Sequence, residues 1–182
     1  MRALTLPNKI TLARLLLIPL FVYLLLAQTL TLSAYLAAGL FLALCLSDAL
    51  DGYLARKTGQ VSELGKLLDP LADKVLVFGA FLVFVEIGKL PSWVVLIIIS
   101  RDLLVMGIRT WAAKEGRILA ASPLGKWKTA FQMASVFFLI LNWGIGYLFF
   151  WVSFLLCLVS GWGYFKDFYS QIEGSFGGDD NG

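Results

Sequence analysis

The sequence contains no histidine, and only 15% of its 182 residues are charged. Without histidine the chain lacks the commonest general base and the usual zinc ligand, so any proton transfer must use a carboxylate, lysine, tyrosine or water. A soluble domain carries about 25% charged residues, whereas 59% of this chain is hydrophobic. So few charges cannot cover a water-facing surface. Composition therefore excludes an ordinary soluble domain and predicts a membrane protein.

Cysteine is scarce as well. Cys45 and Cys157 both lie in apolar runs, without the paired spacing of a disulfide framework or of a thiolate metal site. We interpret both as small apolar packing residues.

Long apolar runs dominate the chain instead. A helix needs about 20 mostly apolar residues to cross the hydrocarbon core. Their uninterrupted apolar character favours helices over the alternating strands of a membrane barrel. We therefore predict an all-α integral membrane protein whose six transmembrane helices form a single catalytic domain over residues 1–170, with a short N-terminal interfacial segment. The predicted spans are 10–27, 31–50, 70–87, 93–112, 124–143 and 146–165.

The C-terminal segment differs in composition from the rest. Residues 171–182 are rich in glycine, aspartate and asparagine, which is typical of disordered tails. We predict disorder there and assign the tail no function.

Lysine and arginine are distributed unequally between the two sides that this topology defines. One side holds only Lys89. Cytoplasmic loops of membrane proteins carry an excess of these residues, so both termini and the loops after the second and fourth spans are predicted to be cytoplasmic. A bacterial inner membrane is the expected location, with the site facing the cytoplasm. The residues on or near the cytoplasmic side are Arg2, Lys9, Arg14, Arg56, Lys57, Lys66, Lys74, Arg101, Arg109, Lys114, Arg117, Lys126, Lys128 and Lys166.

Four aspartates lie where the second predicted span ends and the third begins. Asp48 and Asp51 are three positions apart, and Asp69 and Asp73 are four apart, so each pair shares a helix face. The short connection can bring the pairs together, and the carboxylates would repel one another unless neutralised. Oxygen ligands without histidine or cysteine favour Mg²⁺, Mn²⁺ or Ca²⁺. Four carboxylates could hold a pair of such ions, as a phosphoryl-transfer centre requires.

The alternative is that these carboxylates only form ion pairs with nearby cations. Pairing does not require so tight an arrangement, so we favour the metal site. Small residues fit that choice, because Gly52 and Ala55 keep the helix face after Asp51 open and Gly65 does the same in the loop. Arg56 could bind a diphosphate oxygen. The cations available for simple pairing are Arg56, Lys57, Lys66 and Lys74.

Read in order, residues 48–73 are DALDGYLARKTGQVSELGKLLDPLAD. This stretch resembles the signature of the CDP-alcohol phosphatidyltransferases, D-x2-D-G-x2-A-R-x8-G-x3-D-x3-D, at every fixed position. A chance match at one start point has a probability on the order of 10⁻⁹, because each residue type makes up about 5–8% of proteins. The resemblance implies the six-helix fold of that family, usually as a homodimer, with a polar cavity open to the cytoplasm.

The resemblance also implies roles for the matching positions. Asp73 would be the general base and would also lie close to a metal. The cofactor would be Mg²⁺ or Mn²⁺, as two ions. The other metal ligands would be Asp48, Asp51 and Asp69. The residues around the CDP moiety of CDP-diacylglycerol would be Gly52, Ala55, Arg56 and Gly65.

Two more segments are similar to the branch of this family that uses glycerol 3-phosphate as acceptor. They are LPNKITLARLLLIPLF at 6–21 and RDLLVMGIRTWAAKEGRILAASPLGKWKTAFQM at 101–133. In the family, the stretch from Asn8 to Arg14 lies near the nucleotide, which makes Asn8, Thr11 and Arg14 further candidate contacts for CDP-diacylglycerol. The alternative for this segment is an interfacial helix with snorkelling cations.

The implied reaction joins the free primary hydroxyl of glycerol 3-phosphate to the lipid-linked phosphorus of CDP-diacylglycerol, with CMP leaving. The acceptor's phosphate then needs cations, and the loop between the fourth and fifth spans offers them, although they could equally be topology signals or contacts to anionic lipids. Arg101 lies inside a span, so we predict that it faces the polar interior, paired with Asp102 or another acid. The candidate acceptor-phosphate residues are Arg101, Arg109, Arg117, Lys126 and Lys128.

Other functions remain open at this point. Within the family, the acceptor could be serine, inositol phosphate or another phosphatidylglycerol. A divalent-cation transporter with an intramembrane carboxylate site is a different class, but these acids lie at span ends and the outer side offers no acidic entrance. A scaffold would not need four converging carboxylates. The predicted partners are the two substrates, membrane lipids and a second copy of the chain, with no nucleic acid.

Overall fold

The computed structural model describes residues 6–27, 31–58, 63–114 and 123–176, and the side chains of 11–27, 32–47, 71–113 and 123–162. Within these ranges the chain forms six α-helices. The prediction of an all-α chain with six helices is therefore confirmed. The helices are α1 (Leu6–Leu26), α2 (Thr31–Thr58), α3 (Glu63–Glu86), α4 (Ser92–Lys114), α5 (Pro123–Ile140) and α6 (Ile145–Phe176).

Several helices extend beyond the apolar runs that predicted them. α2 continues past residue 50 to Thr58, and α3 begins at Glu63 instead of residue 70. α6 continues to Phe176, which takes it into residues 171–176 of the segment expected to be disordered. Hydropathy marks only the apolar part of a helix, whereas each further residue adds a backbone hydrogen bond once a helix has formed. Asp48, Asp51, Asp69 and Asp73 consequently lie within helices, not beside them.

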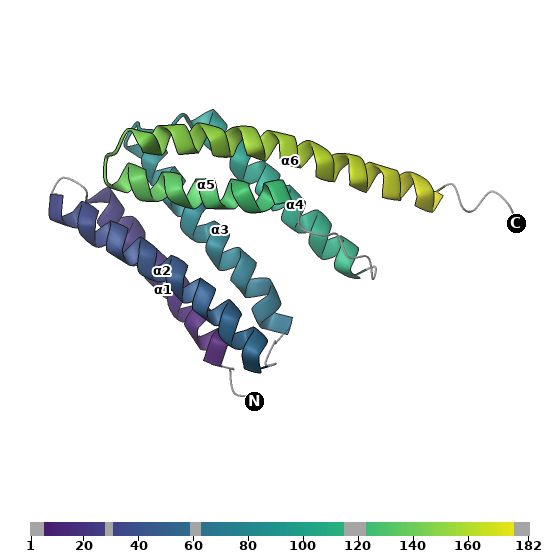
Figure 1. Cartoon of the computed structure of the whole chain (residues 1–182), viewed down its shortest axis with the longest axis horizontal. Helices are drawn as coiled ribbons and strands as arrows, with labels where there is room; N and C mark the ends of the chain where they lie inside the picture. The colour runs from purple at the N-terminus through teal and green to yellow at the C-terminus, as the bar shows by residue number, and fades with distance from the viewer. Residues whose placement is uncertain (1–5, 28–30, 59–62, 115–122, 177–182) are drawn as a thin grey trace, which may run out of the picture.

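The helices are arranged as two hairpins joined by the middle of the chain. α1 and α2 lie side by side at one edge of the molecule, and α5 and α6 lie side by side at the other (Figure 1). α3 packs against α1, and α4 packs against α6. The end of α6 projects past the other helices (Figure 1). This arrangement brings the first turns of α1 and α3 and the last turns of α2 to the same end of the molecule.

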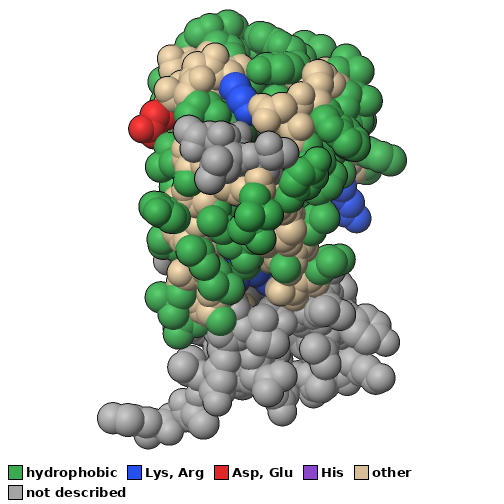
Figure 2. All heavy atoms as spheres, turned by 90° about the vertical axis from the view of Figure 1, so that its left-hand side faces the viewer, with side chains coloured by type: hydrophobic (Ala, Val, Ile, Leu, Met, Phe, Trp, Pro, Cys, Tyr) green, Lys and Arg blue, Asp and Glu red, His purple; other side chains and the backbone are tan. Residues whose placement is uncertain are grey.

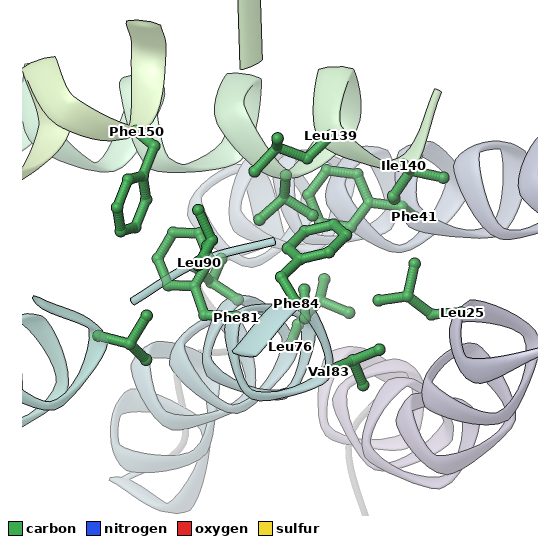
Figure 3. Close-up of a cluster of buried hydrophobic side chains, with 14 of the residues drawn as sticks. Leu25, Phe41, Leu76, Phe81, Val83, Phe84, Leu90, Leu139, Ile140 and Phe150 are labelled. Atoms are coloured by element: carbon green, nitrogen blue, oxygen red, sulfur yellow. The ribbon is translucent and has the colours of Figure 1, made fainter. Parts of the chain in front are cut away.

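An aromatic and aliphatic core fills the opposite end. Phe84 of α3 points toward Phe41 of α2 and Leu139 of α5 (Figure 3), and all three side chains are buried. Phe81 meets Phe150 edge to face, with the ring centroids 5.5 Å apart. Such a pair adds about 0.5–1.5 kcal/mol to the stabilisation from area burial alone. This core fixes the helices at one end and leaves the other end for polar side chains.

The two turns beside this core are tied together by one lysine. Lys89, after α3, donates hydrogen bonds to the carbonyl of Leu139, at 3.2 Å, and to Oδ1 of Asn142, at 2.5 Å. Asn142 has φ 58° and Gly88 has φ 72°, the left-handed conformation that commonly ends helices. The lysine thereby links the α3–α4 turn to the α5–α6 turn.

Much of the surface is apolar. Large hydrophobic side chains are exposed on every helix with described side chains, and they cover most of the described part of the face shown in Figure 2. Among the described residues, one helical segment, Ile145–Trp162, is long and apolar enough to cross a bilayer, and Thr11–Leu26 and Leu32–Ser47 are shorter apolar segments. The transmembrane role of the remaining helices stays a prediction.

Candidate active site

The buried charged residues Arg14, Asp102 and Lys128 lie toward the end of the molecule opposite the aromatic core. In α1 one inward stripe runs Thr11, Arg14, Ile18, Phe21 and Leu25, all of them buried. These spacings of three and four keep the residues on one helix face. The stripe is polar in its first turn and apolar afterwards. The helix therefore carries Thr11 and Arg14 into the interior at the end where the aspartates lie.

Arg14 forms an ion pair with Asp73. Its Nη1 lies 3.0 Å from Oδ1 of Asp73 in α3, with the arginine side chain 1% exposed and the aspartate side chain 29% exposed. A buried charge is tolerated only when it is paired and hydrogen-bonded. The structure thus joins two residues that the sequence assigned to separate roles, a nucleotide contact and the general base. Snorkelling towards the membrane surface does not describe Arg14, because its side chain points inward.

A second charged group lies on the other side of α3. Asp102 of α4 is buried, and its two carboxylate oxygens lie 2.5 and 2.6 Å from Nζ of Lys128 in α5. Lys74 of α3 donates to Oδ2 at 3.2 Å, and Arg101 donates to Oδ1 at 3.0 Å. We call Lys74, Arg101, Asp102 and Lys128 the Asp102 cluster. It connects three consecutive helices through one carboxylate.

Arg101 also links the cluster to α6. Its Nη2 donates to Oγ of Ser160 at 2.8 Å. The next residue, Gly161, leaves room for the arginine, since a Cβ there would lie 3.3 Å from Arg101 Cγ and Nε. The predicted pairing of Arg101 with Asp102 in the polar interior is confirmed.

The two ion-paired groups lie on successive residues of α3. Neighbouring residues of a helix differ by about 100° around its axis, since a turn holds about 3.6 residues. Asp73 is accordingly paired with α1, while Lys74 is paired with α4. The two contacts fix the rotation of α3 at the last aspartate of the signature.

The sequence of residues 4–159 matches the family described as CDP-alcohol phosphatidyltransferase. The chain belongs to this family. It is similar to a Bacillus subtilis (strain 168) protein named CDP-diacylglycerol–glycerol-3-phosphate 3-phosphatidyltransferase, with 38% identity over 93% of this chain and 98% of the relative. A Rickettsia typhi protein of the same name is 33% identical over 88% of this chain and 95% of its own length. A third, from Mycoplasma genitalium, is 41% identical over 63% of this chain and 49% of its own.

In this phosphatidyltransferase the signature aspartates lie on two consecutive helices. Asp48 and Asp51 belong to the last turns of α2, and Asp69 and Asp73 belong to the first half of α3. The side chains of the first three lie outside the described residues, and so do those of Asn8, Gly52, Ala55, Arg56 and Gly65. Among the side chains that are described, no group of three acidic, cysteine or histidine residues gathers to hold a metal.

The donor chemistry of the signature nonetheless fits a hard cation. All four proposed ligands are carboxylates, which suit Mg²⁺ and Mn²⁺. Asp73, the member whose side chain is described, is partly exposed and is held by Arg14 at one oxygen. Asp73 lies in the first half of α3, at the polar end of the molecule.

Four of the five candidate acceptor-phosphate residues have described side chains, and they separate into two sets. Arg101 and Lys128 belong to the Asp102 cluster, and Lys128 is only 2% exposed instead of lying at the loop. Arg109, near the end of α4, and Lys126, near the start of α5, are both exposed. Arg117 lies outside the described residues. The structure brings the first two together and leaves Arg109 and Lys126 at the surface.

The sequence indicated Asp102 only as a possible partner of Arg101, and Lys74 only as a cation that could pair with the signature aspartates; it did not predict that Lys74 and Lys128 both bind Asp102. A signal was available for Asp102, because a carboxylate in the middle of an apolar run is costly unless it has a partner. Lys74 could be identified only with the structure, because its partner lies 28 residues further along the chain.

Proposed function

We propose that this phosphatidyltransferase moves the phosphatidyl group from CDP-diacylglycerol to sn-glycerol 3-phosphate, giving phosphatidylglycerophosphate and CMP. Relatives that span 93% and 88% of the chain carry this activity in their names. The structural observation that supports it is the Arg14–Asp73 ion pair, which holds a partly exposed carboxylate at the polar end of the molecule. The chemistry belongs to phospholipid biosynthesis.

The proposed metal ligands are Asp48, Asp51, Asp69 and Asp73, for two Mg²⁺ or Mn²⁺ ions. When bound, such ions would neutralise the diphosphate and orient the attacking and leaving oxygens. Two features support this proposal. All four proposed donors are carboxylates, and they lie on α2 and α3, two antiparallel helices that are consecutive in the chain (Figure 1).

Asp73 is the proposed general base. Its carboxylate accepts the proton of the acceptor's primary hydroxyl while that oxygen forms a bond to the lipid-linked phosphorus. The bond from this phosphorus to the bridging oxygen breaks, and its electron pair leaves with CMP. Arg14 orients Asp73 throughout, since its guanidinium binds one carboxylate oxygen. Positioning of this kind, together with electrostatic stabilisation, accounts for most of the catalysis in phosphoryl transfer.

The nucleotide is proposed to bind where α1 meets the signature helices. Thr11 and Arg14 are buried on the same face of α1, and Arg14 reaches α3. Arg56 follows the aspartates of α2 in the sequence, and its guanidinium would bind the diphosphate. The proposed CDP-diacylglycerol contacts are Asn8, Thr11, Arg14, Gly52, Ala55, Arg56 and Gly65.

The acceptor phosphate is proposed to bind near the ends of α4 and α5. Arg109 and Lys126 are exposed there, and Arg117 lies between them in the sequence. Arg101 and Lys128 lie deeper, on Asp102. A neutral acceptor such as serine would not need these cations.

The proposed topology has six transmembrane helices, both termini in the cytoplasm and the site facing the cytoplasm of a bacterial inner membrane. Exposed tryptophans support it, because tryptophan favours both membrane–water interfaces. Trp111, Trp127 and Trp162 are exposed at the polar end, and Trp93 and Trp143 are exposed at the core end. Membrane lipids and a second copy of the chain are the proposed partners.

The test measures CMP release by detergent-purified protein given CDP-diacylglycerol and Mg²⁺ or Mn²⁺. Parallel reactions contain glycerol 3-phosphate, serine, inositol phosphate or phosphatidylglycerol. Release only with glycerol 3-phosphate is the expected result. Release with another acceptor would agree with the family assignment but contradict glycerol 3-phosphate as the acceptor. If folded protein releases no CMP with any acceptor, the proposed activity is contradicted, and divalent-cation transport becomes the next hypothesis to test.

A further inference from the structure

We propose that Lys74 binds a phosphate oxygen of one of the two substrates, and that Asp102 is the positioning residue that holds it. This inference rests on the proposed function, because it assumes that phosphate-bearing substrates approach Asp73. Neither residue belongs to the family signature that ends at Asp73.

Exposure distinguishes Lys74 from the other members of the Asp102 cluster. The side chain of Lys74 is 25% exposed, whereas those of Arg101, Lys128 and Asp102 are 14%, 3% and 1% exposed. Nζ of Lys128 donates hydrogen bonds to both carboxylate oxygens of Asp102. Lys74 binds one oxygen at 3.2 Å, and an ammonium has three donors. Lys74 is therefore the member of the cluster best placed to meet a ligand.

Charge favours an anion as that ligand. The single negative charge of Asp102 is shared by Lys74, Arg101 and Lys128, so among the described side chains one carboxylate faces three cations. Buried cations are stable when anionic groups and hydrogen bonds compensate them. A phosphate oxygen at Lys74 would supply the missing negative charge. Both substrates carry phosphate, so the chemistry is shared between them.

Position along α3 supplies the second argument. Lys74 directly follows Asp73, the proposed base, and the ammonium also lies 5.8 Å from the centre of the Phe78 ring one turn later. Any acceptor that gives its proton to Asp73 must bring its oxygen, and the phosphorus that the oxygen attacks, to this part of α3. Lys74 is held toward α4 by Asp102, so a phosphate group that extends from Asp73 around this face of α3 would meet its ammonium.

Asp102 is held firmly enough to act as the positioning group. Lys128 from α5 and Arg101 from α4 both bind it, and Arg101 is itself held by Ser160 of α6. The carboxylate is thereby fixed from three helices. It presents Oδ2 to Lys74 and so determines where the ammonium lies.

The experiment compares Lys74→Gln and Lys74→Arg with the wild type and with Lys89→Gln. The control removes the same charge from the other end of α3, where Lys89 binds Leu139 and Asn142. For each variant, kcat and KM are measured for each substrate with the other saturating. We expect Lys74→Gln to raise the KM of one substrate about tenfold or more, Lys74→Arg to recover part of it, and Lys89→Gln to stay within about twofold.

The identity of the affected substrate separates the two sources of phosphate. A higher KM for glycerol 3-phosphate assigns the acceptor's phosphate, and a higher KM for CDP-diacylglycerol assigns the diphosphate. Asp102→Asn is expected to raise the same KM. The double variant, Lys74→Gln with Asp102→Asn, is expected to have a KM close to that of Lys74→Gln alone. A fall in kcat with both KM values unchanged, or equal effects in Lys89→Gln, would overturn the proposal.

A binding measurement keeps this test independent of turnover. With Mg²⁺ present, the rise in melting temperature caused by glycerol 3-phosphate or by CDP is compared between the wild type and Lys74→Gln. If one ligand no longer raises the melting temperature of Lys74→Gln, the result supports the proposal. This holds even if glycerol 3-phosphate proves not to be the acceptor. Equal rises in both proteins would contradict it.

Discussion

Nη1 of Arg14 lies 3.0 Å from Oδ1 of Asp73, a residue 59 positions later in the chain. The contact joins the first helix to the last aspartate of the family signature. Because Arg14 is buried, packing fixes the position of its guanidinium. The guanidinium in turn fixes the position of the Asp73 carboxylate that it binds. α1 and the proposed base are therefore joined directly through this contact.

The first prediction concerns Asp73 itself. Asp73→Asn is expected to reduce CMP release by about 10²–10⁴-fold, the usual contribution of a positioned general base. It should also lower the melting temperature in detergent, because Arg14 loses the charge of its partner. Glu86→Gln, at the other end of α3, is the matched control and should retain activity. Full activity in Asp73→Asn would exclude Asp73 as the base.

The second prediction tests whether Arg14 and Asp73 act as a pair. The side chain of Arg14 is buried but that of Asp73 is 29% exposed, so removing either partner is expected to cost less than the roughly 3–5 kcal/mol of a fully buried ion pair. Arg14→Met and Asp73→Asn should each destabilise the protein, and the double variant should lose less than the sum of the two. Thermal unfolding of all four proteins in detergent measures the coupling. Additive losses would show that the pair is not formed in solution.

The third prediction applies the same reasoning to the Asp102 cluster. Asp102→Asn leaves Lys128 buried without a carboxylate, so it should destabilise the protein by about 3–5 kcal/mol. Adding Lys128→Met should restore part of that stability, because the buried charge is then gone. Equal stabilities of the single and double variants would indicate that Lys128 is solvated and that Asp102 does not compensate it.

The fourth prediction concerns the metal ligands. Chelation should abolish CMP release, and Mg²⁺ or Mn²⁺ should restore it. Asp51→Asn should raise the metal concentration needed for half-maximal activity by about tenfold or more, since even residues that only support a metal ligand change affinity about 10–100-fold. Glu86→Gln should leave that concentration unchanged. Activity that survives chelation would contradict the metal assignment.

The fifth prediction concerns the turn between α5 and α6. A Cβ at Gly146 would lie 2.9 Å from the backbone nitrogen of Leu139, so Gly146→Ala is expected to cost about 1–3 kcal/mol, the usual penalty of overpacking. Gly39→Ala is the matched control, because a Cβ there meets nothing within 4 Å and alanine favours the helix by about 0.5–1 kcal/mol. Both are read from thermal unfolding. Equal effects would mean that the turn is not tightly packed.

The number of helices was predictable because each helix contains a long apolar run. The pairing of Arg101 with Asp102 was predictable too, since an arginine inside an apolar segment needs an acidic partner and the next residue supplied one. These inferences use only neighbours in the sequence. Helix ends were less predictable, because polar residues extend α2 and α3 beyond the apolar runs.

Contacts between distant segments could not be predicted. Arg14 reaches Asp73 only because α1 and α3 pack together, and no spacing in the sequence reports that packing. Lys128 looked like a loop cation since it lies near the start of an apolar run, yet the rotation of α5 turns it onto Asp102. The candidate acceptor cations therefore divide into a surface set and a buried set for reasons that only the packing supplies.

The central claim is that the primary hydroxyl oxygen of glycerol 3-phosphate attacks the lipid-linked phosphorus of CDP-diacylglycerol. The most direct test uses glycerol 3-phosphate labelled with ¹⁸O in that hydroxyl, followed by mass spectrometry of both products. The account predicts that the lipid product carries the label and that CMP carries none. Label in CMP, or a lipid product without label, would contradict it.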